Sequence, residues 1–481
     1  MKSLLCIDIG TSSIKGGVIN ESGTLEQWNR VSLYAPSGED FNHWDPLHWV
    51  DAIGELIAGL GKSAPGRAVQ GKSAQGKSAP ARLPHANLAH VSGVAVSGNG
   101  PTVVPVDDNG TPSYEALLWL DKRNIKIDDQ PSFFLPKVKW FSVNQPGLYE
   151  RTNLFFSCPE YICYLLTGEA VTITPSGEFS SYIWDSSGIE AYGLDKEKFP
   201  PFVPVTHRIG TVQKKAEEKF GIKAGTPVYA SGSDFLMSLL GTAAVVPGRT
   251  CDRAGTSEGI NYCSRVEIGH PRLRCLPHVI EGYYNVAGIL ASTGRVFEWF
   301  RKISGQLEKP YRQMFEEIEA VAHKENFPRF FPSLHRGPVW DFSGGAFTGL
   351  EPYHEAPCMG KAVVEAIGFA VKDLIYTLEE NNCRIDELRV SGGQARNVLW
   401  NRKKADITGK QIVVPAVVDA ELLGNAAAGF TGAGLFSTLT EAAETLFRAE
   451  EVYEPRREEF EYYESAFATY QEMCRRILTI I

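Results

Sequence analysis

Two short, similar stretches of sequence decide the fold. The first is Asp8-Ile9-Gly10-Thr11-Ser12-Ser13-Ile14-Lys15, which stands between two apolar runs. The second is Ala254-Gly255-Thr256-Ser257-Glu258-Gly259, about halfway along the chain, and an apolar run at residues 260–263 follows it. Glycine allows the positive φ at which a chain reverses between two strands. The sequence therefore predicts two β-hairpins with Gly-Thr-Ser in the turn, one in each half of the chain.

Both turns have the groups that bind phosphate. Backbone N–H groups and the Thr and Ser hydroxyls donate hydrogen bonds, and glycine lets a ligand approach the backbone closely. Asp8 would repel a bare phosphate, but its carboxylate suits a hydrated Mg²⁺ that lies between the two. Either hairpin alone is explained equally well as an ordinary glycine turn, and the occurrence of a pair favours the phosphate interpretation.

Length and charge narrow the class of protein. A chain of 481 residues exceeds what one hydrophobic core usually supports, so we expect two domains, at 1–243 and 244–481. A formal net charge of -9 argues against a nucleic acid or an acidic membrane surface as partner, because binding to phosphates needs a basic face. A small-molecule substrate fits this charge better.

The cysteines and the apolar runs indicate a cytoplasmic protein. The nine cysteines are scattered and none has C-x-x-C spacing, which is typical of reduced thiols rather than of a disulfide framework or a zinc site. The first residues lack the unbroken apolar core of a signal peptide, and the sequence has no apolar window of about 18 residues that would span a membrane.

A five-residue repeat at residues 61–82 is rich in Gly, Lys, Ser and Ala. Residues 66–73 and 71–78 both satisfy the phosphate-loop pattern G-x-x-x-x-G-K-[ST]. No strand is predicted before the matches and no apolar helix after them, and the match recurs only because the repeat has a period of five. We therefore predict a flexible, basic surface insertion at about 61–87 instead of a nucleotide site.

Polar residues follow two predicted strands of the first half. A buried strand over residues 90–97 ends in Ser97-Gly98-Asn99-Gly100, and another over residues 227–230 leads to Asp234 at the start of an apolar helix. Ligands in α/β proteins usually bind at the carboxyl ends of strands. We expect Asp234 to be exposed there as a helix N-cap, a position compatible with both simple capping and catalysis.

A third strand end lies late in the second half. Residues 388–390 lead into Ser391-Gly392-Gly393, and Asn397 follows at a predicted helix start, from where it could reach a base or a ribose. A plain strand-to-helix turn explains this stretch equally well. A helix of small residues at 424–429 is expected to pack beneath it.

Taken together, these features resemble the actin-like ATPase fold, and specifically the FGGY carbohydrate kinases, with xylulokinases the most similar subgroup. The resemblance covers nearly the whole chain. Each of its motifs is weak, and their order and spacing support the assignment to the family. The motifs are Trp119-x-Asp121-x-Arg123, Lys137-x-x-Trp140, Thr167-Gly168-Glu169, Arg336-x-Pro338-x-Trp340, Gly345-x-Phe347-x-Gly349-Leu350, Ala362-Val363-Val364-Glu365 and Ala405-Asp406-x-x-Gly409. The implied fold is α/β, with two actin-like, ribonuclease H-like domains and the active site in the cleft between them.

The resemblance also implies an activity and a set of site residues. Asp234 would be the general base that removes a proton from a sugar hydroxyl as it attacks the γ-phosphate of ATP. Asp8, with Asp234 nearby, would hold Mg²⁺. The nucleotide would contact Gly10, Thr11, Ser12, Lys15, Gly255, Thr256, Ser257, Gly392, Gly393 and Asn397, and the sugar Ser97, Gly98, Asn99, Gly100 and Asp234. A homodimer is an assembly that the resemblance allows.

The departures from the family concern the substrate. Xylulokinases usually have Gln-Met-His-Gly where this chain has Gly98-Asn99-Gly100-Pro101, and Asn or Gln where it has Phe235. The charged Arg-Glu pair of glycerol kinases is absent as well. D-xylulose is therefore the leading expectation among ketoses, aldoses and polyols.

Two other functions compete with the kinase. Residues 255–259 fit the G-x-S-x-G pattern of a serine hydrolase, but that pattern needs a helix after the serine and the residues here predict a strand. A non-catalytic actin-like module that binds nucleotide or sugar as a sensor is the second alternative. The carboxylate of Asp234 argues against it, and sugar-dependent ATP turnover would separate the two.

Overall fold

The computed structural model describes residues 2–33, 43–60, 88, 91–322, 327–333 and 340–480. The chain divides into two compact units: Met1–Ala243 with Pro277–Glu281 and Ala420–Phe447, and Ala244–Leu276 with Gly282–Asp419 and Arg448–Ile481. The domain boundary after residue 243 stays a prediction, and these units differ from it because two later segments pack with the first unit. The repeat, the predicted insertion at 61–87 and the motif residues Arg336 and Pro338 lie outside the described residues.

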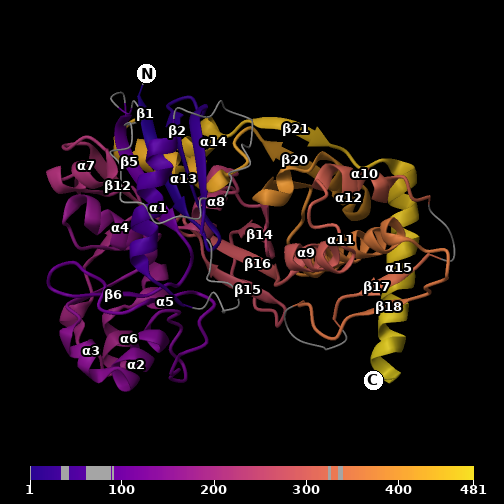
Figure 1. Cartoon of the computed structure of the whole chain (residues 1–481), viewed down its shortest axis with the longest axis horizontal. Helices are drawn as coiled ribbons and strands as arrows, with labels where there is room; N and C mark the ends of the chain where they lie inside the picture. The colour runs from indigo at the N-terminus through magenta and orange to yellow at the C-terminus, as the bar shows by residue number, and fades with distance from the viewer. Residues whose placement is uncertain are drawn as a thin grey trace. The chain divides into compact units, whose positions relative to one another are not determined.

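The first unit is built on a mixed sheet with the strand order β11-β12-β5-β1-β2-β3. Its strands are β1 (Ser3–Ile9), β2 (Ser13–Asn20), β3 (Leu25–Ser32), β5 (Val91–Gly98), β11 (Arg208–Thr211) and β12 (Pro227–Ser233). β1, β2 and β3 pair antiparallel, whereas β1, β5 and β12 are parallel neighbours. The predicted first hairpin is confirmed, and because β1, β5 and β12 are parallel, their carboxyl ends lie at one edge of this sheet (Figure 1).

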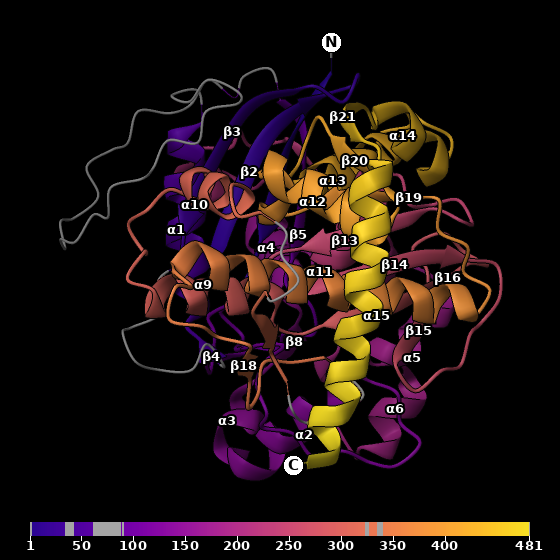
Figure 2. The ribbon, with the colours of Figure 1, turned by 90° about the vertical axis from the view of Figure 1, so that its right-hand side faces the viewer.

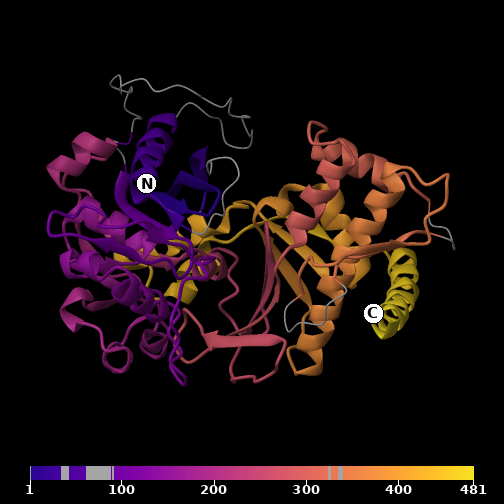
Figure 3. The same ribbon diagram turned by 60° about the horizontal axis from the view of Figure 1, so that its bottom comes forward.

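Helices cover both faces of this sheet. A Cβ on Gly16 would meet Leu56 of α1 (Pro46–Gly59), and one on Gly17 would meet Leu25 and, at 3.6 Å, Leu422 of α13 (Ala420–Gly432). Because neighbouring residues of a strand point to opposite faces, α1 and α13 pack on opposite sides of β2. In Figure 3 the yellow-orange segment of α13 accordingly runs beside the indigo and purple strands of the N-terminus.

The remaining elements of the first unit extend it around this sheet. The helices are α2 (Leu135–Asn144), α3 (Pro146–Arg151), α4 (Cys158–Thr167), α5 (Ser180–Ile183), α6 (Ser186–Ala191), α7 (Lys214–Phe220), α8 (Asp234–Gly241) and α14 (Leu439–Leu446). Short strands pair as β4 (His43–Trp44) with β7 (Ala116–Leu117), β6 (Val104–Val106) with β8 (Leu154–Phe156), and β9 (Thr172–Thr174) with β10 (Phe202–Pro204).

The helix of small residues at 424–429 is not where the sequence placed it. It is the middle of α13, which packs against α8 and the parallel strands of the first unit and not beneath the Gly392 turn. A Cβ on Gly424 would lie 2.0 Å from the carbonyl oxygen of Met237, and one on Gly241 1.8 Å from that of Ala420. The small residues are needed because the backbones of α8 and α13 touch.

The second unit is built on a sheet with the order β15-β16-β14-β13-β19-β20-β21. Its strands are β13 (Thr250–Ala254), β14 (Glu258–Ser264), β15 (Leu273–Pro277), β16 (Tyr284–Leu290), β19 (Glu387–Ser391), β20 (Gln411–Pro415) and β21 (Ala449–Tyr453). β13 and β14 form an antiparallel hairpin, and β13, β19 and β20 are parallel. The first unit has the same arrangement of a hairpin beside parallel strands.

Apolar helices complete the second unit. They are α9 (Thr293–Ile303), α10 (Tyr311–Glu319), α11 (Ala356–Glu380), α12 (Val398–Thr408) and α15 (Arg457–Ile480), with a short ladder of β17 (Arg329–Phe331) and β18 (Ala346–Thr348). α11 packs on β14 and β16, where Leu374 occupies the space above Gly288. α15 runs across α12 (Figure 2). All nine cysteines are free, and the described helices include none that is long and apolar enough to cross a membrane.

Candidate functional site

The first Gly-Thr-Ser stretch forms the predicted hairpin turn. β1 and β2 pair from Ser3 with Asn20 to Ile9 with Ile14, which leaves residues 10–12 as the connection. The amide of Gly10 donates to the carbonyl of Ser13 at 3.0 Å, and Ser12 is exposed. The indole of Trp119 donates to the Thr11 hydroxyl at 3.0 Å. The turn thus presents backbone and hydroxyl donors at the edge of the sheet.

Asp8 is buried at the base of this turn. Ser97, its neighbour across the parallel β1–β5 pair, donates its hydroxyl to Asp8 Oδ1 at 2.8 Å, and Asn425 of α13 donates to the Ser97 hydroxyl at 2.9 Å. Burial raises the pKa of Asp8 to about 7, the carboxylates of Glu421 and Asp234 add to the rise, and Lys15 and Ser97 oppose it. Asp8 is therefore a carboxylate held in one orientation whose charge a cation would stabilise.

Lys15 does not stand alone at this edge. Its ammonium lies 3.8 Å from Asp8 Oδ2 and 3.6 Å from Oε2 of Glu421, a buried residue in the first turn of α13. Sequence reasoning missed Glu421, since it lies more than 400 residues from Lys15. The run of small residues that follows it was a signal for close packing, but it did not identify the partner. The prediction that Lys15 contacts the nucleotide is not tested by this ion pair.

Asp234 is placed differently from the prediction. It is the first residue of α8, whose N-cap is Ser233, and Asp234 is only 8% exposed. The expectation of an exposed capping side chain was wrong, because β12 continues to Ser233 and Asp234 lies in the first turn of α8, a helix that packs against α13. A carboxylate in the first turn of a helix is favoured by the helix dipole. Asp8 and Asp234 come from two strand ends on either side of β5.

The four predicted sugar residues end β5 and begin the next loop. Ser97 and Asn99 are buried, and both side chains bond within the protein: Ser97 to Asp8, and Asn99 to the Ile9 carbonyl at 3.2 Å and to the Thr102 hydroxyl. Gly98 is buried as well, and a Cβ there would contact Cys158 at 3.0 Å. Gly100 is partly exposed. The structure thus places Ser97 beside Asp8 and Gly98 beside Ile9, and the side chains of Ser97 and Asn99 are occupied by bonds within the protein.

The second hairpin also forms as predicted. β13 and β14 pair from Thr250 with Tyr262 to Ala254 with Glu258, and residues 255–257 make the turn, with Thr256 exposed. Since Ser257 leads into a strand and not a helix, the arrangement required for a serine-hydrolase nucleophile is absent from this hairpin.

A glycine loop lies against this second turn. Gly392 has φ +87°, and a Cβ there would lie 2.4 Å from the Ala254 carbonyl oxygen. Gln394, which sequence reasoning missed, donates to the carbonyl of Gly255 at 3.0 Å. The amide oxygen of Asn397 accepts from the Trp400 amide and caps α12. The predicted contact of Asn397 with a base or ribose is not tested, and the structure shows the capping role that the alternative interpretation required.

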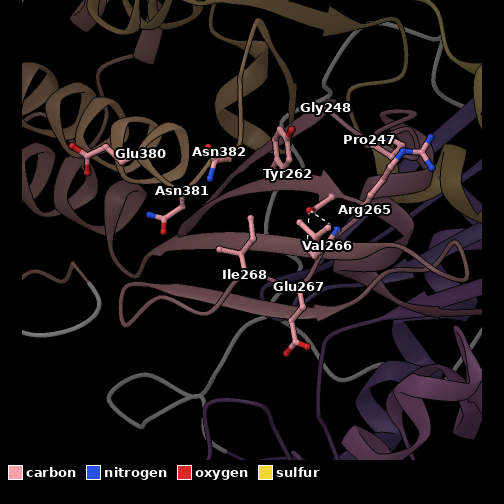
Figure 4. A pocket seen from close by; sticks show the side chains of 11 residues that line it. Pro247, Gly248, Tyr262, Arg265, Val266, Glu267, Ile268, Glu380, Asn381 and Asn382 are labelled. Carbon is pink, nitrogen blue, oxygen red and sulfur yellow. Dashed lines mark hydrogen bonds between the residues drawn. The ribbon is translucent and has the colours of Figure 1, made fainter.

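A cavity of about 550 Å³ lies elsewhere in the second unit (Figure 4). It opens near the start of β13 and the end of β14, which is the opposite end of these strands from the Gly-Thr-Ser turn. The residues that line it are Pro247, Gly248, Tyr262, Ser264, Arg265, Val266, Glu267, Ile268, Glu380, Asn381 and Asn382. It contains none of the predicted site residues.

Comparison with known proteins matches both halves of the chain to one family. The model for the N-terminal domain of the FGGY family of carbohydrate kinases matches residues 3–132 and 128–241, and the model for the C-terminal domain matches residues 253–433. A xylulose kinase of Staphylococcus epidermidis is 24% identical over 98% of this chain and 96% of its own length. An autoinducer-2 kinase of Salmonella paratyphi B is 27% identical over 70% of this chain and 68% of its own length. The crystal structure of xylulose kinase from Rhodospirillum rubrum superposes with a TM-score of 0.78 at 20% identity, and covers 100% of this chain and 99% of that one.

Proposed function

The chain belongs to the FGGY family of carbohydrate kinases and is thus a phosphotransferase, and on that premise we propose that it transfers the γ-phosphate of ATP to a hydroxyl of a small sugar. The observation that carries the proposal is the pair of carboxylates, Asp8 and Asp234, held at the strand ends on either side of β5. Phosphoryl transfer needs positioned groups and neutralised charge more than covalent help from the protein.

Asp234 would act as the general base. Its buried position at the start of α8 keeps the carboxylate in one place, so that it could accept the proton of a sugar hydroxyl as that oxygen attacks the γ-phosphate. This residue also argues against the sensor alternative, because binding alone does not need a base.

Asp8 would hold Mg²⁺ through water, with Asp234 nearby. Carboxylate oxygens are the ligands that Mg²⁺ prefers, and a cation would relieve the repulsion among Asp8, Asp234 and Glu421. Among the described residues no group of three or more Asp, Glu, His and Cys is arranged to bind a metal by itself. We therefore propose that water and phosphate oxygens complete the coordination. When bound, Mg²⁺ would supply charge neutralisation to the phosphates.

The nucleotide would be bound by the glycine turns. Gly10, Thr11 and Ser12 of the first unit and Gly255, Thr256 and Ser257 of the second would donate to phosphate oxygens, with Lys15 as an additional cation. Gly392, Gly393 and Asn397 would contact the adenosine. The packing of Gly392 against Ala254 brings this loop beside the second Gly-Thr-Ser turn.

D-xylulose, or a related ketose or polyol, is the proposed substrate. The full-length similarity to a xylulose kinase supports it, whereas Gly98-Asn99-Gly100-Pro101 and Phe235 differ from the usual xylulokinase residues. Since Ser97 and Asn99 bond within the protein, we propose that they shape the sugar site, and that Gly98 and Gly100 present backbone groups to the sugar. The nine free cysteines are consistent with the proposed location in the reducing cytoplasm. The homodimer remains a prediction.

ADP release with Mg·ATP across a panel of pentuloses, hexuloses, aldoses and polyols tests the proposal. We expect one sugar, D-xylulose or a close relative, to support turnover, and Asp234→Asn to lower kcat by a factor of about 10² to 10⁴ while Mg·ATP still binds. Ser238→Ala is the matched control, because its hydroxyl bonds the Asp234 carbonyl and not the carboxylate. Equal turnover in Asp234→Asn would remove the base from its assigned role, and the absence of turnover with every sugar would favour the sensor.

A further inference from the structure

A buried ion cluster lies at the base of the second Gly-Thr-Ser turn. Asp252 is on β13, Glu258 is the first residue of β14, and Lys404 is on α12. The ammonium of Lys404 donates to Glu258 Oε1 at 2.6 Å and to Asp252 Oδ2. The side chain of Lys404 is 1% exposed and those of the two acids are fully buried. We call these three residues the Lys404 cluster.

The cluster joins the two loops that are proposed to bind the nucleotide. Asp252 and Glu258 stand on either side of residues 255–257, and Lys404 is in the helix that begins directly after Asn397. The contact between Gln394 and the Gly255 carbonyl, at 3.0 Å, is a second link between the same loops. The close approach of Gly392 to Ala254 is a third. A shift of α12 would therefore be transmitted to the turn through Lys404.

Stability alone does not account for this cluster. Two acids share one lysine in the interior, and buried ion clusters of this kind are often no more stable than apolar side chains of similar volume. Asp252 Oδ1 and Glu258 Oε2 have no hydrogen-bond partner among the described residues, which adds to the cost. Burial lowers the pKa of Lys404, but the two carboxylates more than offset this effect, so the lysine stays charged. What the cluster provides is a defined geometry between two strands and a helix.

We propose that Lys404 is a positioning residue for the nucleotide: by holding Asp252 and Glu258 against α12, it sets the position of the Gly255–Ser257 turn relative to the Gly392–Asn397 loop. The inference rests on the proposed function, in which both loops contact ATP. Lys404 is buried and does not itself touch the phosphates. Its loss should therefore weaken nucleotide binding while the affinity for the sugar is retained.

The test is calorimetric binding of Mg·ADP to the full chain, which requires no knowledge of the sugar. We compare Lys404→Met with the charge-balanced triple variant Asp252→Asn, Glu258→Gln, Lys404→Met. Lys361→Met is the matched control, because Lys361 is buried in the same unit but donates to the Val321 carbonyl at 2.6 Å, which is outside α12 and the turns. We expect the Kd for Mg·ADP to rise about tenfold or more in both cluster variants. In the control it should not change, even where the melting temperature falls equally.

The outcomes separate the inference from the proposed function. If the wild type binds Mg·ADP but phosphorylates no sugar, the kinase proposal fails and the comparison of variants still decides the role of Lys404. A folded triple variant with an unchanged Kd would overturn the inference, as would a wild type that does not bind Mg·ADP. If neither cluster variant folds, Lys404→Arg decides: a weaker Mg·ADP affinity at a native melting temperature supports positioning, and an unchanged affinity overturns it.

Discussion

The two Gly-Thr-Ser hairpins have similar turns, but the charged residues at the base of each turn are arranged differently. In the first hairpin, Asp8 pairs across the strands with Lys15, whose ammonium is partly exposed and lies 3.6 to 3.8 Å from its two acidic neighbours. In the second, Asp252 and Glu258 are fully buried around Lys404 at hydrogen-bonding distance. The ion pairs of the first hairpin are longer than hydrogen bonds, whereas Lys404 is hydrogen-bonded to both acids of the second.

This difference fits the two roles that we propose for the hairpins, magnesium binding at Asp8 and phosphate binding at the second turn. A carboxylate that is to bind Mg²⁺ needs neighbouring groups that tolerate a change in its charge. A turn that only donates to phosphate needs a rigid support instead. Substitutions at corresponding places in the two hairpins therefore test this difference.

The largest difference is expected between the two lysines. Lys404→Met leaves two buried acids without their cation and should lower the free energy of unfolding by roughly 3 to 5 kcal/mol. Lys15→Met should cost about 1 to 2 kcal/mol, because its ion pairs are longer than hydrogen bonds and partly solvated. Urea unfolding followed by circular dichroism measures both. Equal losses in the free energy of unfolding would show that the two lysines stabilise their hairpins to the same extent.

The next largest effect concerns the acids. Asp8→Asn should lower kcat/KM for Mg·ATP by about a hundredfold or more, because it removes the proposed magnesium ligand while the amide can still accept from Ser97. Asp252→Asn leaves the Lys404–Glu258 pair intact and should change kcat/KM by less than about tenfold. Steady-state kinetics at saturating sugar would give both values. A large loss in Asp252→Asn alone would reverse the roles assigned to the hairpins.

A smaller effect is expected at Gly392. Alanine there meets the Ala254 carbonyl at 2.4 Å and should weaken Mg·ADP binding by roughly 1 to 3 kcal/mol through displacement of the turn. Gly305→Ala is the control, since Gly305 also has a positive φ, +69°, but nothing lies within 4 Å of its added Cβ. Both variants place an alanine in the left-handed backbone region, so both are strained there. Binding that weakens equally in the two would attribute the effect to strain instead of to the contact.

The smallest effect is the pH dependence of stability. Burial raises the pKa of Asp252 from 3.8 to about 7, Glu258 adds to the rise and Lys404 opposes it. The folded state therefore binds this proton more tightly than the unfolded chain does, and the resulting stabilisation is complete below about pH 4 and is lost as the pH rises through 7. Asp252→Asn lacks this component, so its stability relative to the wild type should improve on the order of 1 kcal/mol between about pH 6 and 7. Parallel curves for the two proteins would contradict the assignment.

The sequence predicted the structural elements that depend on residues close together in the chain. The two hairpins are specified by glycine turns and apolar spacing within a few residues. The same reasoning brought Asp8, Ser97 and Asp234 to strand ends. It did not specify that Asp234 is buried, because α8 packs against α13, which comes from far along the chain.

The long-range partners could not be predicted in this way. Glu421 meets Lys15, and Asn425 donates to the Ile7 carbonyl at 2.9 Å, across a separation of 418 residues. Lys404 lies in an ordinary helical pattern that gives no sign of its two buried acids. For Asn397 the sequence left capping and ligand binding equally open, and only the geometry of α12 shows that its amide oxygen caps the helix.

The late segment Ala420–Phe447 has a consequence for synthesis on the ribosome. The parallel strands of the first unit are complete when residue 233 has been added, but α13, which packs against three of them, follows almost 190 residues later. At 5 to 20 residues per second the emerging chain waits roughly 10 to 40 s with that apolar surface uncovered. The first unit of this protein can therefore complete its packing only after α13 has been synthesised. Nascent chains that stop before residue 420 should be the ones that chaperones bind and proteases degrade.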